Sequence, residues 1–293
     1  MIWLIGCGGM LGRELAGVFK NSGTAFCGTD REVDITNPGA LGAFAEKLCA
    51  KTQVAWVVNC AAYTAVDKAE DDPETCRRLN VDGPGNIAAL CAEVGAGFVH
   101  ISTDYVFDGK GAIPYTEEDP PYPTGVYGIT KRDGETAALH NNSRSYVIRS
   151  AWLYGQYGKN FVTTMLSLMN TRDSIKVVND QQGSPTWARD LAGVIRAVTE
   201  SREDTCPFGI YHYTDAGVIT WYDFAREIYR QGRALGLVKK DCLVEPCTSA
   251  EYPSKAKRPA YSVLDKGKIT KTLGITVPRW DESLREYLGT IAP

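Results

Sequence analysis

Short apolar runs alternate with longer amphipathic stretches through the first half of the chain, and this alternation restricts the fold more than any other feature. Several runs are apolar on both faces, as expected for parallel strands that are covered by helices on each side. The predicted strands lie at 2–5, 25–28, 54–59, 98–102 and 146–149. The predicted helices lie at 10–20, 38–50, 73–94 and 127–140. The pattern therefore predicts an α/β fold with a Rossmann-type, doubly wound parallel sheet.

After Arg149 the alternation becomes less regular, and glycine and tryptophan appear in the loops. We therefore predict a dinucleotide-binding domain at 1–150 and a smaller, mainly substrate-binding lobe at 151–293. Segments around 175–215 are expected to return to the main sheet. Because no repeat or flexible linker separates the two parts, we expect a firm interface with a ligand in the cleft between them.

Composition excludes several classes of partner. The formal net charge is −3 and the basic residues are scattered, so nucleic acid is not an expected partner. No apolar stretch reaches the ~18 residues that a membrane span needs, and the opening MIWLIG is too short for a signal peptide. The nine cysteines are scattered without a C-x-x-C pair, which is typical of neither a disulfide framework nor a zinc site. A cytoplasmic protein is expected.

Three glycines follow the first predicted strand. Gly6, Gly9 and Gly12 in GCGGMLG have the G-x-x-G-x-x-G spacing between a strand and a helix. Glycine permits positive φ and lets backbone N–H groups approach a pyrophosphate at the helix N-terminus. A tight turn alone would explain the spacing, but its place after the first strand favours dinucleotide binding.

The second predicted strand leads into Asp30 and Arg31, a little over twenty residues after the first glycine. Asp30 is suited to hydrogen bonds with an adenosine ribose, whereas Arg31 is suited to a 2′-phosphate. The two side chains therefore favour NADH and NADPH respectively, and a solvated turn is the alternative.

Tyr127 and Lys131 are four residues apart in VYGITKRDGE and share one face of a predicted helix. A tyrosine with an ordinary pKa of about 10 is a poor acid at neutral pH unless a nearby charge stabilises its phenolate. The ammonium of Lys131 provides such a charge and is able to hold a nicotinamide ribose as well. An amphipathic helix alone also explains the spacing.

Thr103 follows an apolar strand in HISTDYVFDG, where ligands bind in open α/β sheets. Its hydroxyl would hydrogen-bond the reacting oxygen. The alternative is that Thr103 and Asp104 only form the turn that ends the strand.

The glycine turn, the strand-end threonine and the tyrosine–lysine helix resemble, in this order, the extended short-chain dehydrogenase/reductase family. Within it, several segments are similar to the dTDP-4-dehydrorhamnose reductases, which reduce a 4-keto sugar with NADPH or NADH. These segments are NCAAYTAVDKAEDDPE, STDYVFDG, YGITKRDGE, RSAWLYG, NDQQGSPT and KRP. The similarity covers nearly the whole chain. It implies hydride transfer to the ketosugar while Tyr127 supplies the proton.

The resemblance also implies roles for matching positions. The catalytic residues would be Tyr127, Lys131 and Thr103. The remaining cofactor contacts would come from Gly6, Gly9, Met10, Leu11, Gly12, Asp30, Arg31, Asp34, Ile35, Ala61, Ala62, Tyr63, Thr64 and Ile101. The remaining substrate contacts would come from Asp104, Trp152, Asn160 and Arg258, the last two at the nucleotide diphosphate.

One feature departs from the family pattern. Well-known members bind magnesium between two subunits with acidic residues, and Glu14 matches one of them. The position after Ala188 is Arg189, however, and the chain ends TIAP without the expected glutamate. A metal-bridged dimer is therefore not expected, and a monomer or a homodimer remains open.

Two alternatives to the reductase remain. A nucleotide-sugar epimerase or dehydratase would use the same tyrosine and lysine with tightly held NAD. The dehydratases usually have an acidic pair after the threonine, whereas here Asp104 is followed by Tyr105. The regulatory subunit of methionine adenosyltransferase also resembles these reductases, and a non-catalytic role of that kind is the second alternative.

Overall fold

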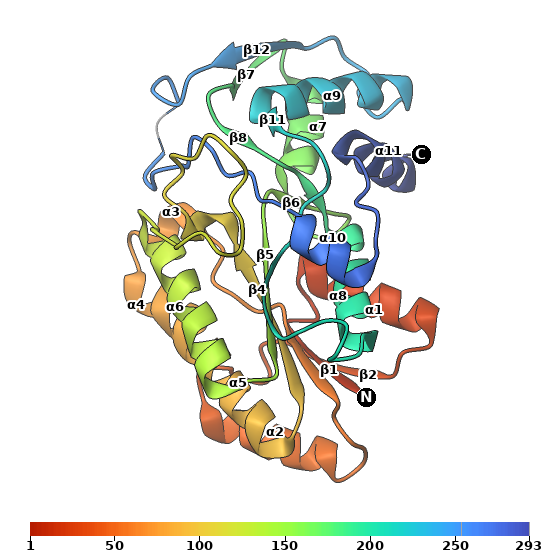
Figure 1. Cartoon of the computed structure of the whole chain (residues 1–293). Helices are drawn as coiled ribbons and strands as arrows, with labels where there is room; N and C mark the ends of the chain where they lie inside the picture. Colours follow the sequence, from red (N-terminus) through yellow and green to blue (C-terminus); the bar gives the residue numbers. More distant parts are fainter. Residues whose placement is uncertain (253, 293) are drawn as a thin grey trace.

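A six-stranded parallel sheet forms the centre of the computed structural model, which describes residues 1–252 and 254–292 (Figure 1). The strand order is β10-β5-β4-β3-β1-β2. β2 therefore lies on one side of β1, and β3, β4, β5 and β10 follow in turn on the other side. This order, with helices on both faces, confirms the predicted Rossmann-type fold. The strands are β1 (Ile2–Ile5), β2 (Phe26–Thr29), β3 (Trp56–Asn59), β4 (Gly97–Thr103), β5 (Ser145–Ser150) and β10 (Gly209–His212).

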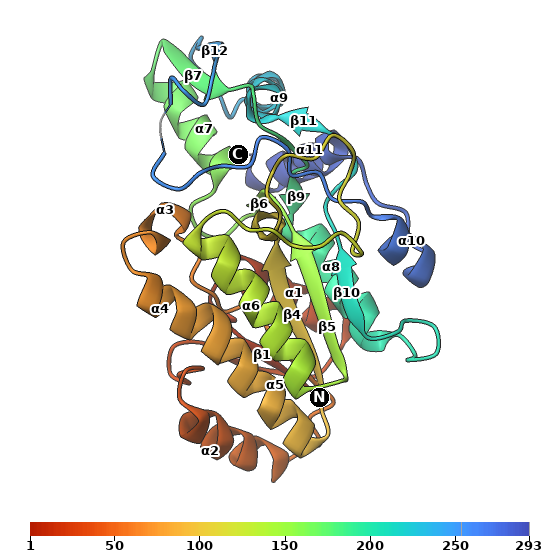
Figure 2. The ribbon, with the colours of Figure 1, turned by 60° about the vertical axis from the view of Figure 1, so that its left-hand side comes forward.

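Two apolar cores lie on opposite faces of this sheet. On one face, α1 (Met10–Ser22) packs beside α8 (Ala188–Glu200), with α10 (Gly267–Leu273) at the edge. The other face is covered by α2 (Pro38–Cys49), α5 (Gly83–Val94) and α6 (Val126–Asn141). Figure 2 shows α5 and α6 lying side by side across this second face. Burial on both faces explains why the strands read as continuous apolar runs.

The predicted helix at 73–94 is correct in extent but is not one regular helix. It consists of α4 (Pro73–Arg77), a π-helical turn η1 (Arg78–Asp82) and α5. Pro84 has no N–H to donate to the carbonyl of Asn80, which favours the wider turn. The Asn80 carbonyl faces α6, where a side chain at Gly134 would collide with it. The helices that were not predicted are α3 (Val66–Ala69), the 3-10 turn η2 (Asp104–Val106), α7 (Phe161–Thr171) and α10.

The smaller lobe has its own apolar core between helices and short strand pairs. Its helices are α7 (Phe161–Thr171), α9 (Trp221–Ala234) and α11 (Trp280–Ile291). Its paired strands are β6 (Leu153–Tyr154) with β9 (Thr186–Trp187), β7 (Ser174–Val178) with β12 (Leu243–Cys247), and β8 (Gln182–Gly183) with β11 (Ile219–Thr220).

The segments around 175–215 divide between the two parts of the molecule. The strand at Gly209–His212 pairs with β5 and forms one edge of the main sheet. The strand at Ser174–Val178 does not return to that sheet, which corrects the expectation for this segment. Its alternate residues are buried against the small lobe, and its backbone is paired with β12 instead.

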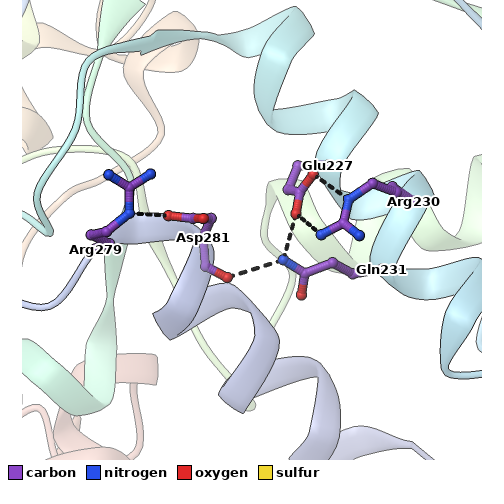
Figure 3. A network of polar contacts seen from close by, with 5 residues as sticks. All are labelled: Glu227, Arg230, Gln231, Arg279 and Asp281. Carbon is purple, nitrogen blue, oxygen red and sulfur yellow. Dashed lines mark hydrogen bonds and ion pairs between the residues drawn. The ribbon is translucent and has the colours of Figure 1, made fainter.

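Polar contacts join α9 to the start of α11 in the small lobe (Figure 3). The amide of Gln231 donates to Glu227 Oε1 over 2.7 Å and to the Asp281 carbonyl over 3.0 Å. Glu227 also accepts from Arg230, and Arg279 Nε donates to Asp281 Oδ1 over 3.1 Å. Because Gln231 is buried, these bonds fix how the two helices meet.

Within residues 1–252 and 254–292, no helix is both long and apolar enough to cross a bilayer. No cluster of three or more histidine, cysteine, aspartate or glutamate side chains is arranged to hold a metal ion in that same part of the chain. All nine cysteines are free thiols.

Candidate active site

A cleft of about 750 Å³ opens at the carboxyl ends of β1, β3 and β4, between the sheet and the small lobe. It lies where the strand order reverses, which is where open α/β sheets bind their ligands. Most residues predicted to bind cofactor or substrate line it. They are Gly6, Gly9, Met10, Leu11, Asp30, Arg31, Ala61, Ala62, Thr64, Ile101, Thr103, Asp104, Tyr127, Lys131, Trp152 and Arg258.

The turn between β1 and α1 has no room for a side chain at Gly6 or Gly12. Gly6 has φ +76°, and a Cβ there would lie 2.7 Å from the backbone nitrogen of Ala61. A Cβ at Gly12 would collide with the Gly6 carbonyl. No side chain caps the first turn of α1, where Gly9 is the N-cap, so backbone N–H groups face the cleft at the positive end of the helix dipole. This bare turn fits a pyrophosphate.

The Asp30 carboxylate lies directly over this turn. A Cβ at Gly8 would collide with Asp30 Oδ2. The backbone N–H of Asp30 donates to Glu32 Oε1 over 2.8 Å, so a second carboxylate lies close by. Arg31 also lines the cleft, with its side chain exposed. Asp30, which favours NADH, and Arg31, which favours NADPH, therefore lie at the same end of the cleft.

Tyr127 and Lys131 both lie on the face of α6 that meets the cleft. Burial raises the pKa of the Tyr127 phenol, and a hydrogen bond with Thr103 acts in the opposite direction. The Lys131 side chain is almost fully buried, and its Nζ donates to the Ile101 carbonyl over 2.6 Å. Burial lowers the pKa of Lys131 to about 8. The pair thus combines a protonated phenol with an amine that titrates near neutral pH.

Thr103 and Asp104 end β4 beside this pair. The Thr103 hydroxyl donates to Asp104 Oδ1 over 2.9 Å and accepts from the backbone N–H of Tyr105 over 3.2 Å. Burial raises the pKa of Asp104 to about 6, with the hydrogen bonds to the carboxylate acting in the opposite direction. The two side chains therefore do form the turn, and they also face the cleft.

Two tryptophans stack at the side of the cleft that faces the small lobe. The rings of Trp152 and Trp221 have centroids 3.6 Å apart and planes within 12°. Trp152 has a positive φ of 49°, the one such non-glycine residue among those described. A Cβ at Gly183 would lie 2.5 Å from the Trp152 ring, so the indole is held on two sides.

Arg258 enters the cleft from the irregular segment before α10. Its guanidinium donates to the Tyr105 hydroxyl over 2.8 Å and to Asp67 Oδ2 over 2.7 Å. Tyr105 in turn packs edge-on against Tyr127, with ring centroids 5.5 Å apart. The guanidinium is thus held by α3 and by the turn after β4, next to the ring that packs against the predicted proton donor.

Five predicted site residues do not line the cleft. Gly12 packs under the glycine turn, and Ile35 is buried against Gly83. Asp34 accepts hydrogen bonds from Thr36, which lower the pKa of its carboxyl. The remaining two are Tyr63, whose backbone pairs with the Asn80 amide, and Asn160, whose side chain caps α7 and donates to the Gly155 carbonyl.

Several lining residues were not predicted. Tyr105 belongs to the STDY segment, so its position near Thr103 could have been predicted from the sequence. Trp221 gave no comparable signal, because it begins a helix about seventy residues after Trp152. The others are Gly8, Cys60, Val66, Leu79, Ser102, Ser150, Ala151, Leu153, Lys159 and Leu191.

Comparison with known proteins gives consistent results. Residues 1–292 match the family described as RmlD substrate binding domain. A dTDP-4-dehydrorhamnose reductase of Streptomyces griseus is 42% identical over 97% of this chain and 92% of its own.

Two solved structures are similar throughout. A dTDP-4-dehydrorhamnose reductase of Clostridium acetobutylicum has a TM-score of 0.90 at 43% identity and covers 99% of both chains. The enzyme of that name from Bacillus anthracis, solved in complex with NADP, has a TM-score of 0.90 at 31% identity, over 99% of this chain and 98% of its own. With its Rossmann-type sheet and its cleft, the chain belongs to the dTDP-4-dehydrorhamnose reductase family.

Proposed function

We propose that this chain reduces the 4-keto group of dTDP-4-dehydro-L-rhamnose to give dTDP-L-rhamnose, with NADPH as the reductant. The observation that carries the proposal is the convergence of Tyr127, Lys131 and Thr103 on one cleft beside a bare glycine turn. The relatives named as dTDP-4-dehydrorhamnose reductases, one of them in complex with NADP, support the choice of substrate and cofactor.

The cleft fits a dinucleotide at one end. When bound, NADPH supplies the hydride for the ketosugar. The glycine turn and the N-terminus of α1 would hold the pyrophosphate, while Asp30 and Arg31 would face the adenosine ribose. Ala61, Ala62 and Thr64 follow β3 and would line the middle of the cofactor site, with Ile101 on β4 beyond them.

The protein's own part is to place the sugar and supply a proton. The raised pKa of Tyr127 keeps its phenol protonated at neutral pH, so it is ready to give a proton to the oxygen formed from the C4 carbonyl. Thr103 would hydrogen-bond the same oxygen. Lys131 lies one helical turn away, and its ammonium form would stabilise the phenolate that remains.

The other end of the cleft suits the nucleotide sugar. Trp152 would form an apolar wall for the sugar ring, and Arg258 would face the diphosphate. Asn160 is a weaker candidate for the diphosphate, because its amide already caps α7 and bonds to Gly155.

Incubating the protein with dTDP-4-dehydro-L-rhamnose and NADPH, and following the absorbance of the reduced nicotinamide, tests the proposal. We expect one NADPH consumed per sugar reduced. Turnover of a nucleotide sugar without net consumption would instead support the epimerase or dehydratase alternative. Absence of any turnover, with retained ligand binding, would favour a regulatory role.

For assembly and location, we propose a cytoplasmic enzyme that acts as a monomer or as a homodimer without a bridging metal. Arg189 lies close enough to Glu14 to oppose the rise in the pKa of that carboxyl that burial causes. A cation at this place opposes binding of a second cation such as Mg²⁺. Sedimentation with and without EDTA tests this, since metal-dependent association would contradict it.

A further inference from the structure

Tyr105 lies between the predicted diphosphate contact and the predicted proton donor. It belongs to η2, two positions after Thr103, and it lines the cleft. Its hydroxyl accepts from Arg258 Nη1 over 2.8 Å, although the two residues are 153 positions apart in the chain. Its ring packs edge-on against Tyr127, with centroids 5.5 Å apart and planes at 77°. One side chain therefore contacts both ends of the predicted substrate site.

The backbone of Tyr105 is held from two sides. Its N–H donates to Thr103 Oγ1 over 3.2 Å. Its carbonyl lies against α6 at Gly128, where a Cβ would collide with the carbonyl oxygen. Gly128 follows Tyr127 directly, so this close approach holds Tyr105 beside the first turn of α6. The same two elements, the end of β4 and α6, therefore place Tyr105 and both hydroxyls that are predicted to face the C4 oxygen.

The Tyr105 hydroxyl is a neutral hydrogen-bond partner. Burial raises the pKa of the phenol to about 12, with the charge of Arg258 acting in the opposite direction. The phenol is therefore protonated at neutral pH, and its oxygen accepts from the guanidinium without carrying a charge. The guanidinium meets a negative charge at Asp67, whose Oδ2 accepts from Nη2 over 2.7 Å. A guanidinium has five N–H donors, so these two bonds leave others for a diphosphate.

The spacing between Arg258 and Tyr127 matters because the two ends of a nucleotide sugar are joined covalently. The diphosphate and the C4 carbonyl belong to one molecule, with the sugar ring between them. The carbonyl meets the proton donor in a reactive geometry only when the cation that holds the diphosphate stands at the matching distance. Tyr105 joins these two side chains through one hydrogen bond and one ring contact.

We propose that Tyr105 is a positioning residue that fixes the spacing between the diphosphate-binding guanidinium of Arg258 and the proton donor Tyr127. The role rests on the proposed function, because the nucleotide sugar must span both side chains. The hydroxyl acts on substrate binding through Arg258, and the ring acts on proton transfer through Tyr127. Removing the hydroxyl alone and removing the whole ring should therefore have different effects.

Two substitutions at Tyr105 separate these effects. Tyr105→Phe loses the bond to Arg258 but keeps the ring, so we expect KM for dTDP-4-dehydro-L-rhamnose to rise about tenfold, with kcat changed less than about twofold. Tyr105→Leu also loses the ring, so kcat should fall about tenfold or more in addition. KM for NADPH should stay unchanged in both variants.

Tyr261→Phe is the matched control for the loss of a phenol oxygen. Tyr261 belongs to the same segment as Arg258 but does not line the cleft, so both kinetic constants should stay unchanged. An unchanged KM in Tyr105→Phe, or the same loss of kcat in Tyr105→Phe and Tyr105→Leu, would overturn the role.

A double-variant cycle tests whether the hydroxyl acts through Arg258 rather than through a general loss of structure. In an Arg258→Met background the bond is already absent, so adding Tyr105→Phe should change KM by less than about twofold. A further rise as large as in the unmodified protein would contradict the role. If Tyr105→Leu does not fold, this cycle still decides.

Calorimetric titration with dTDP tests the binding part without turnover. dTDP carries the diphosphate but no sugar, so we expect its Kd to rise about tenfold in Tyr105→Phe and equally in Tyr105→Leu. Equal Kd values in Tyr105→Phe and the unmodified protein would overturn the role even if the ketosugar is reduced as proposed. Absence of dTDP binding to the unmodified protein would overturn it as well, because Arg258 would then hold no diphosphate.

Discussion

Arg258 and Asp67 lie 191 positions apart in the chain, yet their side chains form an ion pair of 2.7 Å at the edge of the cleft. The same guanidinium also bonds to the Tyr105 hydroxyl, which places it over α3 and the end of β4. The segment before α10 is thereby fastened to the opposite wall of the site.

The first prediction concerns this arginine. Arg258→Lys keeps the charge but loses the paired N–H groups that suit a diphosphate, so we expect KM for the nucleotide sugar to rise about tenfold. KM for NADPH should stay unchanged. Arg279→Lys, at an exposed arginine that does not line the cleft, serves as control. Steady-state kinetics with each substrate varied in turn measures both, and equal rises in the two KM values would exclude a role at the sugar nucleotide.

Removing the phenol oxygen of Tyr127 should stop proton transfer. For Tyr127→Phe we expect kcat to fall by about 10²-fold or more, because the ring stays in place but has no proton to give. Fluorescence titration should show NADPH binding close to that of the unmodified protein. Tyr122→Phe, at an exposed position, should retain full activity. Undiminished turnover in Tyr127→Phe would remove this residue from the mechanism.

The carboxylate over the glycine turn should influence the choice of cofactor. Asp30→Asn removes a negative charge that would repel a 2′-phosphate, so we expect the ratio of kcat/KM for NADPH over NADH to rise about tenfold. Arg31→Met should change the same ratio in the opposite direction. An unchanged ratio in both variants would show that neither side chain influences the choice of cofactor, and a shift in the same direction in both would contradict their opposing roles.

The buried carboxyl of Asp104 should make stability depend on pH. Its pKa is raised to about 6, so the folded state holds this proton more tightly than the unfolded chain. The stabilisation is complete below about pH 4 and is lost as pH rises through about 6.

Replacing this carboxyl tests that sign. Asp104→Asn removes the cost of burying the charge, so we expect the free energy of unfolding at pH 8 to rise by up to about 2 kcal/mol. At pH 4 the two proteins should differ little. Urea unfolding at both pH values measures the difference, and a larger gain at the acidic pH would contradict the assignment.

The parts of the fold that were predictable depend on short stretches of sequence. The strand, glycine turn and helix from Ile2 to Ser22 are contiguous, and their pattern follows from burial on both sheet faces and from glycine's freedom at Gly6. Tyr127 and Lys131 are one helical turn apart, so their common face follows from helix geometry. Their roles in binding and catalysis stay predictions.

Other features depend on contacts that no local pattern encodes. The pairing of β7 with β12 joins segments about seventy residues apart, and apolar alternation alone does not distinguish this partner from the main sheet. The π-helical turn at η1 was missed because its cause, the missing N–H of Pro84, is also compatible with a regular helix start. The capping box formed by Asn160 and Thr163, in contrast, could have been predicted from the sequence as the start of a helix. It gives the Asn160 amide a structural role that requires no ligand.

The stacked indoles have a consequence for altering substrate range. Trp152 is confined by Trp221 on one side and by the bare backbone of Gly183 on the other, in a backbone conformation that few side chains tolerate. A library that varies Trp152 alone would mostly yield misfolded pockets, because its neighbours are shaped to that ring. Productive variants should require all three positions to be randomised as one unit, or exchanged together with those of a relative that accepts a bulkier sugar.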